Sequence, residues 1–233
     1  MTNTIQNIKI DESSLGIIEL TSKYPFELFT VDKIKKLTKT NYATAYRKVD
    51  LLVNLGVFSK TMYGMASQIR IDLSKEKTIS ILSLIEAKKL EMFAKKLKEI
   101  VRRSIKEIMN DAENLSEFKC IVIFGSYAKG TQTKESDLDV LVIYEPSTIA
   151  VSLLKDRFEY YIKGIKDFIM GVFKTNELRA GVKINPIIVS GEEHREMILD
   201  KRINVAKEAL FSHIILKGRS AYWEEIAWCT NAK

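Results

Sequence analysis

The chain has 233 residues, of which 46% are hydrophobic and 29% are charged, and its formal net charge is +7. It is long enough for one large or two small globular domains. No apolar run is long enough to span a membrane and the N-terminus lacks signal-peptide character, so we expect a cytoplasmic protein with no membrane contact. Cys120 and Cys229 are far apart and lack metal-ligand spacing, which favours free thiols in a reducing compartment.

The N-terminal segment, residues 1–77, is predicted to contain three helices and then a two-stranded hairpin. We expect helices over 14–23, 31–37 and 42–55, and strands over 57–63 and 68–73. The third helix ends at Gly56, a residue typical of the position after a helix. On this helix Ala45, Val49 and Leu52 share one face, which predicts that this face is buried.

This arrangement resembles the winged helix-turn-helix of prokaryotic regulators, in which the third helix enters the major groove of DNA. Residues 33–75 hold nine basic side chains and two acidic ones, a charge balance typical of phosphate contacts. The alternative is a protein-interaction module that uses the same fold and has a solvated lysine face. The side chains expected to contact duplex DNA are Tyr42, Thr44, Tyr46, Arg47, Lys48 and Lys60.

Residues 78–115 are predicted to connect two domains through one long helix. Apolar residues follow one stripe from 78 to 112, and no glycine or proline interrupts it. Such a helix could be a rod between domains, a seam for a homodimer, or an amphipathic helix packed on its own domain.

The most informative stretch of the chain runs from Ile121 to Tyr144. An apolar segment over 121–124, typical of a buried strand, is followed at once by Gly125 and Ser126, and a second strand follows Asp137 and Asp139. Residues two apart on a strand point to the same face, so we expect the two carboxylates to lie together. Paired carboxylates suit Mg²⁺ and a Gly-Ser turn before a short helix suits phosphate, which together indicate phosphoryl or nucleotidyl transfer.

The string Gly125-Ser126-Tyr127-Ala128-Lys129-Gly130, followed by Ser136-Asp137-Leu138-Asp139, resembles the signature of the DNA polymerase β-like nucleotidyltransferases, especially the small prokaryotic members. The resemblance implies that Gly125 and Ser126 bind the phosphates of a nucleoside triphosphate, with ATP the first candidate. It also implies that Asp137 and Asp139 hold Mg²⁺, or Mn²⁺ as an alternative. Lys129 is a candidate for neutralising phosphate, and Ser136 for supporting the acidic turn.

The superfamily usually has a third carboxylate on the strand after the following helix. We expect that helix over 148–173 and the strand over 182–189, and the strand contains Asn185 but no acid. An amide oxygen can ligate a metal, but it has no charge and cannot accept a proton. Glu177, which we expect in a loop, is the nearest alternative. Nucleotide and Mg²⁺ binding are therefore better supported than rapid turnover.

These elements predict an α/β (α+β) protein with a winged helix-turn-helix over 1–77, a linker helix over 78–115 and a nucleotidyltransferase fold over 116–233, in which helices flank a mixed β-sheet. The predicted function is transfer of a nucleoside monophosphate from a triphosphate to an acceptor hydroxyl, coupled to DNA binding. Two alternatives remain. One is a nucleotide-sensing regulator with little turnover, and the other is an antitoxin-like module that binds a helical toxin-like protein.

Overall fold

The computed structural model describes residues 10–64, 66–113, 118–146, 152–154, 157–180 and 182–231. The chain divides into two compact units, Met1–Ile81 and Leu82–Lys233, each with its own buried apolar core. Among the residues in these ranges, no helix combines the length and apolar character needed to cross a bilayer.

The first unit contains three helices and a hairpin at the positions that the sequence predicts. The elements are α1 (Glu12–Ser22), α2 (Val31–Thr38), α3 (Tyr42–Asn54), β1 (Phe58–Tyr63) and β2 (Ala66–Ile71). Each helix begins after a side chain that accepts a hydrogen bond from the first turn: Asp11, Thr30 and Asn41. Such caps satisfy backbone N–H groups that the helix leaves open.

The core of the first unit forms where the helices meet the hairpin. Strands β1 and β2 pair in antiparallel register from Phe58↔Ile71 to Tyr63↔Ala66. The predicted inner face of α3 is confirmed, since Ala45, Val49 and Leu52 are all buried. The helices and hairpin therefore have the elements of a winged helix-turn-helix, while the identification as that DNA-binding fold stays a prediction.

The single long helix predicted over 78–112 is wrong. The structure has two helices instead, α4 (Glu76–Lys96) and α5 (Glu99–Glu113), and Leu97 and Lys98 separate them. Phe93 of α4 and Val101 and Ile105 of α5 belong to the same buried cluster. The helix breaks because both segments bury their apolar faces in one core, and this packing outweighs the uninterrupted helical pattern.

The second unit is organised around a four-stranded mixed sheet. Its strands are β3 (Phe118–Ile123), β4 (Leu138–Tyr144), β5 (Ile184–Ser190) and β6 (Ile214–Lys217), in the spatial order β5-β4-β3-β6. Strands β4 and β5 are parallel, whereas β3 is antiparallel to both β4 and β6. The edge position of β5 accommodates Pro186, which cannot donate a ladder hydrogen bond.

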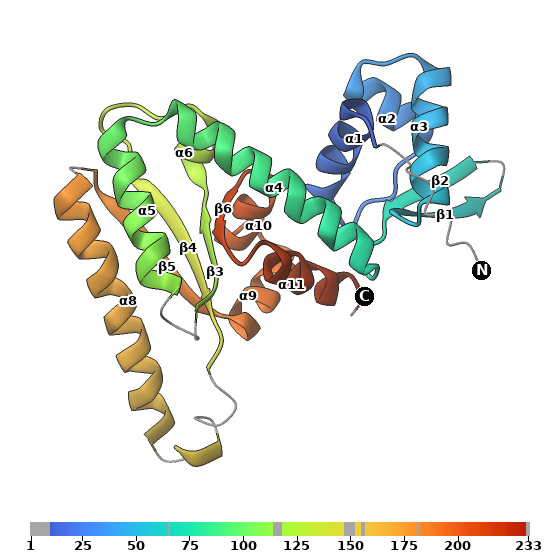
Figure 1. The fold of residues 1–233 in the computed structure, drawn as a ribbon. Helices are drawn as coiled ribbons and strands as arrows, with labels where there is room; N and C mark the ends of the chain where they lie inside the picture. Colours follow the sequence, from blue (N-terminus) through green and yellow to red (C-terminus); the bar gives the residue numbers. More distant parts are fainter. Residues whose placement is uncertain are drawn as a thin grey trace, which may run out of the picture. The chain divides into compact units, whose positions relative to one another are not determined.

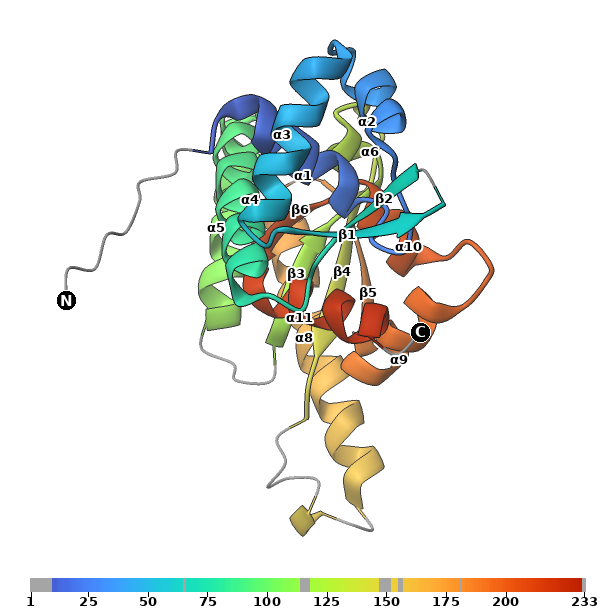
Figure 2. The same cartoon turned by 90° about the vertical axis from the view of Figure 1, so that its right-hand side faces the viewer.

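Helices cover both faces of this sheet (Figure 1). Helices α5 and α8 (Phe158–Ala180) pack on one face, where Ile108, Ile169 and Phe173 contact the buried strand residues. The other face carries α9 (Gly191–Leu199), α10 (Val205–Phe211) and α11 (Arg219–Asn231). In both Figure 1 and Figure 2, the N-terminal part of α8 extends beyond the ends of the strands.

Helix α8 corrects the predicted helix over 148–173, because it begins at Phe158 and ends at Ala180. Residues 147–151 and 155–156 lie outside the described part of the chain, so the start predicted at Thr148 is not described. The later end matters for function, because it places Glu177 on a helix rather than in a loop.

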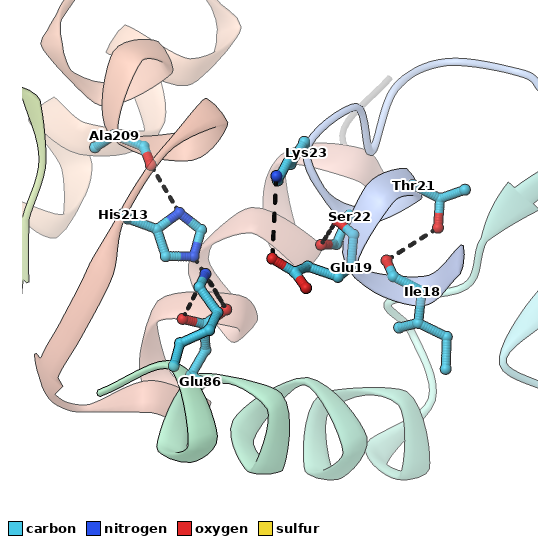
Figure 3. Close-up of polar contacts among 9 residues, drawn as sticks. Ile18, Glu19, Thr21, Ser22, Lys23, Glu86, Ala209 and His213 are labelled. Atoms are coloured by element: carbon cyan, nitrogen blue, oxygen red, sulfur yellow. Dashed lines mark hydrogen bonds and ion pairs between the residues drawn. The ribbon is translucent and has the colours of Figure 1, made fainter. Parts of the chain in front are cut away.

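His213 joins helix α4 to the C-terminal elements through hydrogen-bond contacts on both ring nitrogens. One ring nitrogen lies 2.7 Å from the carbonyl of Ala209 and the other 3.2 Å from the Glu86 carboxylate (Figure 3). Burial acts to raise the pKa of Glu86, but the neighbouring His213 and Lys89 side chains hold it below its ordinary value. Cys120 and Cys229 are both present as thiols, as the sequence predicts, and both are buried.

Candidate functional site

The predicted catalytic residues come together where β3, β4 and β5 meet α6 (Gly125–Lys129). Helix α6 starts directly after Phe124, which follows the last residue of β3. Asp137 precedes β4 by one residue, and Asp139 is the second residue of that strand. Because β4 and β5 are parallel, Asn185, the second residue of β5, lies at the same edge and pairs in register with Asp139.

Gly125 allows the turn before α6 to approach the carboxylate of Asp139. Its φ angle is +68°, a conformation that side-chain-bearing residues rarely adopt, and a Cβ atom there would lie 2.3 Å from Oδ2 of Asp139. The backbone of the Gly-Ser turn and the second motif acid are therefore in close contact, although β4 begins only at Leu138. Phe124 cannot cap α6 with its side chain, so the N-cap residue itself supplies no acceptor for the first N–H groups of this helix.

We expect Gly125→Ala to impair both folding stability and nucleotide binding. The left-handed conformation alone costs an alanine about 1–2 kcal/mol, and the new methyl group would displace the carboxylate of Asp139. Denaturant unfolding and calorimetric titration with ATP and Mg²⁺ measure the two effects. Gly130→Ala is the matched control, because Gly130 also has a positive φ of +71° but a Cβ there meets nothing within 4 Å. Equal nucleotide affinity in the two variants would contradict the role of this contact.

The carboxylate of each of the two acids accepts a hydrogen bond from a side chain on or next to β5. Asn185 Nδ2 donates to Oδ1 of Asp139 at 3.1 Å, and Lys183 Nζ lies 2.8 Å from Oδ2 of Asp137. The hydrogen bond and charge of Asp137 raise the pKa of Lys183 above its ordinary value. Leu138, between the two acids, is 2% exposed. Its side chain therefore points to the opposite face from those of Asp137 and Asp139, as the spacing predicts, although Asp137 lies one residue before the strand.

Two of the other predicted site residues, Lys129 and Ser136, have side-chain partners of their own. Lys129, at the end of α6, forms an ion pair of 2.8 Å with Glu208 of α10. The hydroxyl of Ser136 accepts a hydrogen bond of 2.8 Å from the backbone N–H of Thr133, which closes the turn before Asp137. Ser126 is half-buried in the first turn of α6. Ser136 thus supports the turn that leads to Asp137. Lys129 lies beside Glu208, an acid that would compete with phosphate for the lysine side chain.

Glu177 approaches the site from α8. Its Oε2 accepts a hydrogen bond of 3.2 Å from the backbone N–H of Ile184, the first residue of β5. The predicted loop position of Glu177 is wrong, because Glu177 lies on α8. The chain turns after α8 into β5, so the Glu177 carboxylate still lies beside the strand that carries Asn185. In this arrangement Glu177 holds the start of β5 in place.

The donor set fits one divalent cation that shares its coordination with a substrate. Asp137 and Asp139 offer two carboxylates, which are hard ligands of the type that Mg²⁺ prefers. Asn185 turns its Nδ2 toward Asp139, and rotation of this side-chain amide would present its oxygen as a third ligand. Within the described residues, no group of three or more His, Cys, Asp or Glu side chains is placed to hold a metal. The set therefore suits Mg²⁺ bound together with phosphate oxygens, and not a cage made by protein alone.

The sequence interpretation missed Lys183 as a residue of this site. Lys183 and Asn185 are two apart, as are Asp137 and Asp139, and the two pairs run side by side in the parallel register of β4 and β5. Because side chains two apart on a strand share one face, the position of Asn185 could have indicated that Lys183 also belongs to the site. Glu208 was also missed, because nothing in the sequence brings α10 to the end of α6.

The predicted DNA-contact residues lie in the first unit, on and next to α3. The rings of Tyr42 and Tyr46 stack with centroids 6.3 Å apart, and both rings are about half exposed. Arg47 and Lys60 are exposed, while Thr44 is half-buried. Lys48 forms an ion pair with Asp11. A cavity of about 310 Å³ is lined by both tyrosines and Lys60, and also by the acidic side chains of Asp32 and Asp50.

Comparison with known proteins finds one matching family model and several related proteins. Residues 102–205 match the family model described as nucleotidyltransferase domain. "Putative protein adenylyltransferase MJ0126" of Methanocaldococcus jannaschii is 36% identical over 84 residues, which cover 35% of this chain and 78% of that protein. "Putative protein adenylyltransferase MJ0604" of the same organism is 29% identical over 122 residues, covering 52% and 96% of the two chains. No solved structure matches this chain significantly.

Proposed function

The chain belongs to the DNA polymerase β-like nucleotidyltransferase superfamily, and we propose that it transfers the adenylyl group of ATP to an acceptor hydroxyl. The contact between Gly125 and Asp139 carries this proposal, because it joins the phosphate-binding turn to the acidic strand. Adenylyl is the first candidate group because the relatives are named as adenylyltransferases. Their names also make a protein side chain the first candidate for the acceptor.

In this proposal the triphosphate lies along the start of α6. The backbone of Gly125 and Ser126 approaches the phosphates, because Gly125 has no side chain to keep them away. Asp137, Asp139 and the amide oxygen of Asn185 would hold Mg²⁺, which when bound neutralises phosphate charge and polarises the reacting phosphorus. The acceptor oxygen attacks the α-phosphorus in line, and pyrophosphate leaves. The protein contributes chiefly by positioning the groups and balancing charge.

Turnover is expected to be slow, because Asn185 occupies the position opposite Asp139 where the family usually has an acid. An amide cannot accept the proton of the attacking hydroxyl. This feature favours a second candidate function, a regulator that binds DNA and senses the nucleotide without rapid transfer. The basic side chains of residues 33–75 support that candidate.

Incubation of the full chain with labelled ATP, CTP, GTP or UTP, Mg²⁺ and host extract tests the proposed transfer. A labelled macromolecule with ATP, absent when EDTA is added, is the expected result. Label from another nucleotide would correct the choice of ATP. Nucleotide binding without any labelled product would favour the regulator.

We expect the full chain to bind duplex DNA with an affinity that falls steeply with salt, because lysine and arginine contacts release counterions from the phosphates. Arg47→Ala should reduce the slope of log K against log salt by about 1. Arg103→Ala is the control, since Arg103 is exposed on α5, outside the first unit. Fluorescence anisotropy at several salt concentrations measures the slope. An equal effect of both variants, or no binding at low salt, would contradict a DNA-contact surface on α3.

A further inference from the structure

We propose that Lys183 is a mobile cation of the nucleotide site, which neutralises Asp137 before the nucleotide binds and then contacts the triphosphate. This inference rests on the proposed function and concerns the same site. It assigns a positioning and binding role to a residue on the edge strand that lies outside the Gly-Ser and Asp-x-Asp motif.

A backbone hydrogen bond fixes the position of Lys183 in the sheet, while its exposed side chain is free to move. The carbonyl of Lys183 accepts a hydrogen bond of 2.7 Å from the N–H of Leu138, which places the residue directly beside Asp137. Its side chain is 69% exposed and that of Asp137 is 36% exposed, although the ion pair between them measures 2.8 Å. An exposed lysine pair of this kind contributes little to stability, so the ammonium group can leave Asp137 without a large cost.

The charges of the site explain why a lysine belongs there. The carboxylates of Asp137 and Asp139 carry two negative charges, and Lys183 reduces this to one while no metal is bound. One divalent cation on Asp137 and Asp139 balances both carboxylates and leaves the ammonium group without its partner. The Glu177 carboxylate nearby already accepts a hydrogen bond from the N–H of Ile184, so a flexible lysine can turn to the oxygens of a bound triphosphate. Lys183 would thus oppose binding of the metal alone and favour binding of the metal with nucleotide.

Other contacts already hold β5 in place, so the Lys183 side chain is not required for the fold. Glu177 accepts a hydrogen bond from the N–H of Ile184, and Asn185 pairs with Asp139 along the ladder. The bond from Leu138 involves only the backbone of Lys183 and remains when the side chain is changed.

The test compares Lys183→Met with wild type in two binding measurements on the full chain. Electron paramagnetic resonance measures the affinity for Mn²⁺ alone, and calorimetry measures the affinity for ATP with Mg²⁺. We expect Mn²⁺ to bind about threefold more tightly to the variant, because a surface ion pair no longer competes. We expect ATP to bind about tenfold more weakly, because a charge-assisted contact to phosphate is lost. Lys183→Arg should restore most of the ATP affinity, and Lys174→Met, at an exposed position of α8, should change neither value.

The opposite signs of the two changes separate this role from a structural one. Weaker binding of both ligands would mean that Lys183 only supports the site, and unchanged binding of either ligand would also overturn the proposal. A wild-type protein that binds neither Mn²⁺ nor ATP would instead refute the proposed nucleotidyltransferase function. Circular dichroism of each variant confirms that the fold is intact before the affinities are compared.

Discussion

Replacing Asp139 by asparagine is expected to weaken the binding of ATP with Mg²⁺ by about a hundredfold, a cost typical of removing one member of a hydrogen-bonded charge pair. The substitution keeps the size of the side chain but removes the negative charge that offsets the cation. Asp139 should be the more sensitive of the two acids, because its Oδ2 lies against Gly125 and its Oδ1 accepts from Asn185. Calorimetric titration of the full chain, with and without EDTA, measures the effect.

Asp137→Asn should weaken binding in the same direction, and Asp167→Asn is the control, since Asp167 is an exposed aspartate on α8. In wild type, EDTA should remove most of the ATP affinity. In the Asp139→Asn variant, whose ATP affinity is already reduced, EDTA should cause little further loss. Retention of wild-type affinity by both motif variants would exclude Asp137 and Asp139 as the metal ligands. The binding site would then have to be sought elsewhere on the chain.

The central site could be predicted from the sequence because its parts are close in the chain. Gly125, Ser126, Asp137 and Asp139 lie within one strand-turn-strand unit, and the period of a strand predicts the spacing of the two acids. The motif could not show that Asp137 would stand just before β4 and pair with Lys183. That contact depends on the parallel pairing of β4 with β5, which brings together residues about 46 positions apart.

The break between α4 and α5 could not be predicted from the hydrophobic pattern. The apolar stripe continues through Leu97, which packs against the same core as Phe93 and Val101. Periodicity reports which face of a helix is buried, but not whether the helix bends to keep that face on the core. The position of Glu177 was missed for a related reason, because the predicted helix ended before it.

The second large effect is expected for Asn185→Asp, which should increase the rate of adenylyl transfer by about a hundredfold, the lower range for a positioned general base. Asn185 already points at Asp139, to which it donates at 3.1 Å, so an aspartate would place a proton-accepting oxygen at the same point without a change in size. Two carboxylates at that distance repel each other unless a cation lies between them. The melting temperature of the variant should therefore depend more strongly on Mn²⁺ than that of wild type.

A matched control exists in the first unit, because Asn54 donates to Asp50 at 3.3 Å in the same amide-to-carboxylate arrangement. Asn54→Asp should lower stability slightly, without acquiring transfer activity or a stronger response to Mn²⁺. Rapid transfer by wild type that Asn185→Asp leaves unchanged would show that the base lies elsewhere, and Glu177→Gln would then be the decisive variant. If Glu177 only fixes the start of β5 through Ile184, its replacement should lower stability and transfer together. If Glu177 is the base, transfer should fall while ATP affinity and the melting temperature remain close to those of wild type.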